Sequence, residues 1–105
     1  MNQTYKVEVS IELKELIPIF LEETKKNINL LNESIEKNDL EKIRFYSHRI
    51  KGSAASYGIN RLSILAKNLE DIIKTNQNMN LINTLFLDLK NTFENLHIVY
   101  VNKSL

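Results

Sequence analysis

The chain has 105 residues, of which 43% are hydrophobic and 26% charged, so it has room for one small domain with a single core. Its formal net charge of +1 points neither to a nucleic acid nor to an anionic membrane surface. The absence of cysteine excludes disulfides and thiolate metal sites. A polar N-terminus and the lack of an apolar run of about 20 residues predict a cytoplasmic protein that is neither exported nor membrane-spanning.

The N-terminal residues form a short lead-in segment before the first strong pattern. Val7 to Ser10 alternate apolar and polar residues too briefly to distinguish an extended segment from the start of a short helix. From Pro18 onward, apolar residues recur every three or four positions, which predicts a long amphipathic helix with proline in its first turn. Asn38 and Asp39 are expected to end this helix and cap the next one.

Three more helices are predicted from the same periodicity. The second runs from about Leu40 to Tyr57, with Gly58 as its C-terminal stop. The third begins after Asn60, interpreted as an N-cap, and runs from Arg61 to about Lys74. A polar turn at 75–78 separates it from a fourth helix, from about Leu81 to Val101.

These elements predict an all-α fold. Only 2 glycines and 1 proline interrupt the chain, and short connections favour antiparallel neighbours. We therefore expect residues 1–105 to form a single domain, with an antiparallel four-helix bundle in up-down-up-down order over about 17–101.

His48 is the most informative residue of the second helix. At about 100° per residue, the apolar stripe of that helix falls within about 60° of the point opposite the imidazole, so His48 should face solvent. Arg44, Lys51 and Gly52 share its face because they lie three or four positions away. Glycine inside a helix costs about 0.5–1 kcal/mol relative to alanine, so Gly52 suggests that something approaches the backbone there.

An exposed histidine with cationic neighbours suits phosphoryl chemistry. A neutral imidazole has one ring nitrogen with a free lone pair, and Lys51 and Arg44 offer hydrogen-bond donors to an anion. The sequence pattern shows no carboxylate adjoining His48, no glycine-rich phosphate loop and no acidic cluster for magnesium. We therefore expect no metal site and no cofactor of its own, and a partner must supply Mg²⁺ and the in-line group.

The run His48-Arg49-Ile50-Lys51-Gly52-Ser53, followed by Tyr57-Gly58, resembles the signature of histidine-containing phosphotransfer (HPt) domains of bacterial multistep phosphorelays. The segments 16–21 and 62–70 are also similar to that family. The resemblance implies a four-helix bundle in which His48 accepts a phosphoryl group on Nε2 from a receiver-domain aspartate and passes it to another receiver. It further implies that Lys51 interacts with the phosphoryl group and that Gly52 lets the receiver approach.

The implied partners are response-regulator receiver domains, with a sensor or hybrid histidine kinase upstream. From helical position we expect Phe45, Arg49, Ala55 and Ser56, with Arg44, to frame the docking surface. We expect a monomeric, freestanding phosphocarrier that catalyses nothing alone. A domain excised from a larger kinase remains an alternative.

Two other functions compete with the phosphocarrier. A module that docks on receivers without transfer would not need the set of His48, Lys51 and Gly52. A phosphoacceptor helical fragment of a histidine kinase resembles a family with an acidic residue directly after its histidine, whereas Arg49 stands there. The second histidine, His97, is expected to be structural or solvated.

Overall fold

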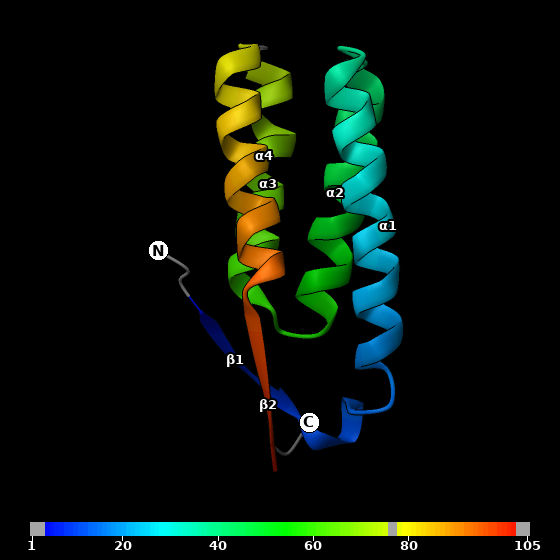
Figure 1. Ribbon diagram of the computed structural model, residues 1–105, viewed down its shortest axis with the longest axis vertical. Coiled ribbons are helices and arrows are strands. Elements are labelled where there is room, and N and C mark those ends of the chain that lie inside the picture. Colours follow the sequence, from blue (N-terminus) through cyan, green and yellow to red (C-terminus); the bar gives the residue numbers. More distant parts are fainter. Residues whose placement is uncertain (1–3, 76–77, 103–105) are drawn as a thin grey trace.

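The computed structural model describes residues 4–75 and 78–102, so part of the predicted polar turn, residues 76–77, lies outside the described residues. Four α-helices follow a short strand and one turn of 3₁₀ helix, and a second strand ends the described chain (Figure 1). In chain order the elements are β1 (Tyr5–Ser10), η1 (Ile11–Leu13), α1 (Ile17–Glu36), α2 (Leu40–Ser56), α3 (Asn60–Thr75), α4 (Met79–Glu94) and β2 (Leu96–Val101).

The helix ends follow the local chemistry of their residues. Pro18 lies in the first turn of α1, where a missing N–H costs nothing. Asn38 adopts a positive φ of 52° after α1, and the Asp39 side chain caps α2 by accepting a hydrogen bond from the Lys42 N–H at 3.2 Å. Gly58 follows α2 with a φ of 74°, a conformation that glycine adopts without a steric penalty. These predicted boundaries are confirmed.

The predicted start of the third helix is shifted by one residue. Asn60 is the first residue of α3 rather than its N-cap, and the Ile59 carbonyl accepts the hydrogen bond from the Ser63 N–H at 3.1 Å.

The prediction that the fourth helix continues to Val101 is wrong. α4 ends at Glu94, and residues 96–101 form a strand that pairs in parallel with β1, with Tyr5 opposite Leu96 and Val9 opposite Tyr100. The segment 96–101 is rich in β-branched and aromatic residues, which favour strands over helices. The N-terminal segment, which the sequence left undecided between extended chain and helix, is therefore a strand. A pair of parallel strands accompanies the four helices, so the all-α prediction is incomplete.

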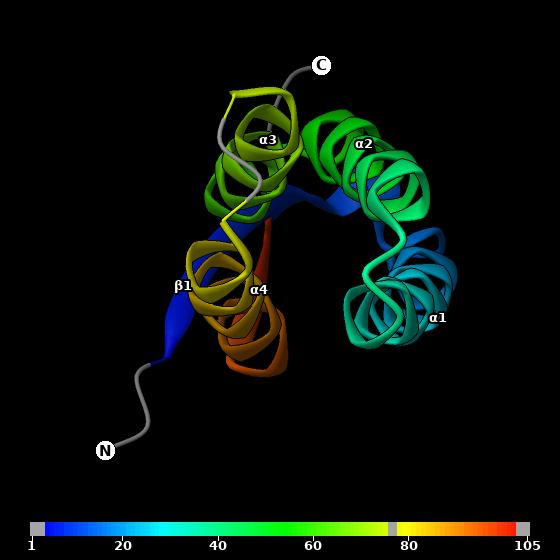
Figure 2. The same ribbon diagram turned by 90° about the horizontal axis from the view of Figure 1, so that it is seen from above.

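The helices enclose one hydrophobic core, and α2 lies between α1 and α3 (Figure 2). The stripe predicted for the second helix is buried, as its Ile43, Ile50 and Ala54 show. The strand pair lies at one end of the helices (Figure 1), where Val9 is buried and the Arg61 guanidinium of α3 stacks 4.3 Å from the centre of the Tyr5 ring. Among the described residues, none of the helices combines the length and the apolar character that crossing a bilayer requires.

Candidate functional site

His48 projects from the outward face of α2, as its helical position predicts. Its side chain is 65% exposed, whereas its neighbours Ser47 and Ile50 are buried. Arg44 and Gly52, one turn to either side, are also exposed. The imidazole is therefore fixed to a helix whose other face is packed in the core, which holds the backbone beneath it rigid.

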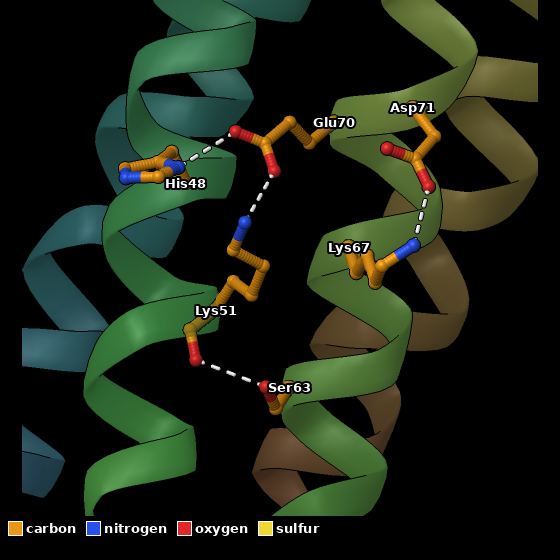
Figure 3. A network of polar contacts seen from close by, with 6 residues as sticks. All are labelled: His48, Lys51, Ser63, Lys67, Glu70 and Asp71. Carbon is orange, nitrogen blue, oxygen red and sulfur yellow. Dashed lines mark hydrogen bonds and ion pairs between the residues drawn. The ribbon is translucent and has the colours of Figure 1, made fainter.

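Glu70 of α3 reaches across to His48. Its Oε2 lies 2.7 Å from the His48 Nδ1, and its side chain is only 7% exposed (Figure 3). The prediction that no carboxylate adjoins the histidine is wrong, because spacing along one helix does not reveal a contact between two. One signal was present in the sequence: Glu70 places a charge within the apolar stripe formed by Ala66, Leu69 and Ile73.

Lys51 pairs with the other oxygen of the same carboxylate. Its Nζ donates a hydrogen bond to the Glu70 Oε1 at 2.8 Å, and its side chain is 29% exposed. Burial alone would raise the pKa of Glu70, but hydrogen bonds from Lys51 and His48, together with their charge, outweigh burial and lower that pKa below its usual 4.5. Glu70 is therefore ionised at neutral pH.

The ionised carboxylate selects one form of the imidazole. A carboxylate only accepts hydrogen bonds, so Nδ1 must carry the proton that it donates to Glu70. In the neutral ring Nε2 then holds the lone pair, and it lies on the side of the ring away from α3 (Figure 3). When the ring is neutral, its unprotonated nitrogen is therefore the one on the side away from Glu70.

A hydrogen bond between the backbone of α2 and a side chain of α3 holds this arrangement in register. The Ser63 hydroxyl donates to the Lys51 carbonyl at 3.0 Å (Figure 3). The neighbouring pair Lys67–Asp71 is formed within α3 and does not involve the histidine.

Gly52 is not required by the packing of this fold. A Cβ added there would meet no atom within 4 Å, and the residue lies in a regular, exposed part of α2. Within the described residues, no close contact between helices therefore requires a glycine at this position. The Ser56 side chain, one turn further on, donates a hydrogen bond from its hydroxyl to the Gly52 carbonyl at 3.0 Å.

A groove between α2 and α3 runs beside the histidine. Three of the predicted docking residues line it with His48, namely Arg44, Phe45 and Arg49, and the Arg49 guanidinium lies 5.6 Å from the Phe45 ring centre. The remaining lining residues are Glu41, Lys51, Glu70 and Lys74. Ala55 and Ser56 are exposed but line a different depression, beside β1. The structure thus separates the predicted docking residues into two places.

The second histidine does not join the site. His97 lies on β2, exposed, rather than on a fourth helix. No group of three histidine, cysteine, aspartate or glutamate side chains in residues 4–75 and 78–102 is placed to hold a metal ion.

Comparison with known proteins identifies the family. Searches of curated proteins and of solved structures returned no match. The Hpt domain family, by contrast, matches residues 15–97, which include α1 to α4 and both residues of the His48–Glu70 pair. The chain therefore belongs to the Hpt domain family, the phosphocarrier modules of phosphorelays.

Proposed function

We propose that His48 accepts a phosphoryl group from the aspartate of a receiver domain and passes it to another receiver. One observation carries this proposal: an exposed imidazole whose Nδ1 is held at 2.7 Å by a buried, ionised carboxylate, with Nε2 facing solvent. A nucleophile needs a lone pair and an open approach, and Nε2 has both.

The transfer step needs no base from this chain. The Nε2 lone pair attacks the phosphorus of the partner's aspartyl phosphate, the N–P bond forms, and the P–O bond to the aspartate breaks. The aspartate leaves as a carboxylate, and the ring becomes a phosphorylated imidazolium that keeps its proton on Nδ1. Glu70 stabilises that developing positive charge through the existing hydrogen bond. The same steps in reverse order pass the phosphoryl group from His48 to the aspartate of a second receiver.

Lys51 and Gly52 have supporting roles in this proposal. Lys51 keeps Glu70 ionised through the 2.8 Å ion pair, and the contact with the phosphoryl group that the resemblance implies requires its ammonium to turn from that carboxylate toward Nε2. Gly52 leaves the surface of α2 low enough for a receiver to approach, which is consistent with the empty space around its Cα. Arg44, Phe45 and Arg49 frame the docking surface along the groove.

The partner supplies what the carrier does not have. A receiver contributes the in-line aspartate and Mg²⁺, and a sensor or hybrid histidine kinase stands upstream. We place this exchange in the cytoplasm, with the carrier as a monomer and its helices in antiparallel up-down-up-down order. The short connections at Lys37–Asp39 and Tyr57–Ile59 support that order.

A transfer assay tests the proposal. The protein is incubated with Mg²⁺ and a panel of purified, phosphorylated receiver domains, and acid-labile, base-stable phosphate on the carrier is measured. Wild type should acquire phosphate, His48→Ala should not, and His97→Ala serves as the matched control because it removes the other histidine. If receivers bind the wild-type protein but never lose phosphate to it, a docking module replaces the phosphocarrier.

A further inference from the structure

Two cations in the groove beside His48 have no assigned partner. Arg44 lies on α2 one turn before the histidine, and Lys74 lies on α3 one turn after Glu70. Both line the groove that also contains His48. Within the described part of the chain, neither side chain forms a hydrogen bond or an ion pair. The pair therefore has its charge available to another molecule.

The other cations of the groove already have partners, and its carboxylates are too few to neutralise Arg44 and Lys74. Lys51 is paired with Glu70, and Arg49 lies over the Phe45 ring. The groove contains four lysine or arginine side chains but only two carboxylates, those of Glu41 and Glu70. Its surface is therefore net positive beside an otherwise nearly neutral chain. A concentrated charge of this kind selects and steers an anionic partner.

The position of Nε2 indicates which anion Lys74 meets. Nδ1 faces Glu70, so Nε2 and any phosphoryl group on it lie on the side of the ring away from α3 (Figure 3). Lys74 projects from α3, the opposite side. A phosphoryl group on His48 is thus turned away from Lys74, and a second anion, carried by the docking partner, is the better match.

We propose that Arg44 and Lys74 together bind an acidic side chain of the receiver domain beside its phosphorylated aspartate, and so select which receivers exchange phosphate with His48. The inference rests on the proposed phosphocarrier function. Charge complementarity supports this occupant, because a receiver that holds Mg²⁺ does so with carboxylates, which makes the surface around its aspartate acidic.

The test separates the receiver from the phosphoryl group. Arg44→Glu and Lys74→Glu are compared with Lys90→Glu, which makes the same charge change at an exposed residue of α4 outside the groove. Each protein is phosphorylated in two ways: by the receiver that transfers fastest to wild type, and by phosphoramidate. Phosphoramidate delivers the same group to Nε2 with release of ammonia and presents no acidic side chain.

The expected result is selective. Both groove variants should lower the second-order rate constant for transfer from the receiver by about tenfold and weaken its dependence on ionic strength. The rate at which the groove variants react with phosphoramidate should stay within about twofold of the wild-type rate. Lys90→Glu should stay within about twofold of wild type in both reactions. Changing a single acidic residue of the receiver to lysine should restore transfer to Lys74→Glu.

Three outcomes would overturn the assignment. Wild-type rates of receiver transfer in both groove variants would remove the pair from docking and leave the proposed function intact. An equal loss with phosphoramidate would mean that the pair holds the phosphoryl group itself. Absence of any transfer to the wild-type protein would remove the proposed function, and the role of the pair with it.

Discussion

Replacing Glu70 by glutamine tests the link between the buried carboxylate and the reactive nitrogen. In the wild-type protein, Glu70 accepts hydrogen bonds from the His48 Nδ1–H at 2.7 Å and from Lys51 at 2.8 Å. Glutamine has nearly the same shape but no charge, and only its carbonyl oxygen accepts hydrogen bonds. If that oxygen faces Lys51, the amide NH₂ faces the ring and favours an acceptor at Nδ1, which moves the proton to Nε2.

The size of the effect follows from the geometry. A hydrogen bond to a charged group contributes about 1.5–3 kcal/mol net, roughly twice the value of a neutral one. Glu70→Gln therefore removes at least half of that stabilisation, and solvent screening at a histidine that is 65% exposed favours the lower end of the range. A loss of about 1 kcal/mol changes the ratio of the two neutral tautomers by about fivefold.

Imidazole ¹⁵N NMR measures this ratio directly. At a pH where His48 is neutral, the wild-type spectrum should show a protonated Nδ1 and an unprotonated Nε2, and Glu70→Gln should shift the balance toward Nε2–H. Glu41→Gln is the matched control, because Glu41 lines the same groove but forms no hydrogen bond with His48 in the described residues. If the ratio of the Nδ1–H to the Nε2–H tautomer is the same in wild type and in Glu70→Gln, Glu70 does not control the tautomer of His48.

Three further predictions concern stability. Because folding lowers the pKa of Glu70 below 4.5, its ionised form stabilises the fold above that pH, and this contribution disappears as the pH falls through the folded pKa. Chemical denaturation at a series of pH values should show wild type losing stability relative to Glu70→Gln below about pH 4.5, and a constant difference would contradict the linkage. Lys51→Met should cost about 1–2 kcal/mol in urea denaturation at neutral pH, since it leaves a buried carboxylate with one partner; an unchanged midpoint would show that the pair adds nothing. Gly52→Ala should raise the free energy of unfolding by about 0.5–1 kcal/mol while slowing receiver transfer, whereas Gly58→Ala, at a φ of 74°, should lower it. A Gly52→Ala protein that is both more stable and fully active would remove the docking role of the glycine.

Features that depend on near neighbours in the sequence could be predicted. Pro18, Asp39 and Gly58 mark helix ends through their own backbone chemistry. The exposure of His48 follows from its angle to the apolar stripe of α2, and the family resemblance rests mainly on the run 48–53 within that same helix.

Features that depend on distant residues could not be predicted in the same way. Glu70 lies 22 residues from His48, and periodicity within one helix contains no information about the alignment of two. Strand β2 was mistaken for helix because Leu96 and Tyr100 continue the spacing of Leu89 and Phe93. The β-branched and aromatic residues of 96–101 were a local signal for a strand, but the partner strand is at the other end of the chain, so the pairing itself could not be predicted from that segment.

The parallel pairing of β1 and β2 has a mechanical consequence. The first residue of β1 and the last residue of β2, Tyr5 and Val101, lie at opposite ends of the ribbon. A tensile force applied at these two points pulls the strands past each other and loads their backbone hydrogen bonds together, in shear, rather than one after another. The helices are connected between the strands and carry no load until the ribbon breaks. Stretching should therefore leave the surface around His48 undisturbed until the strands separate.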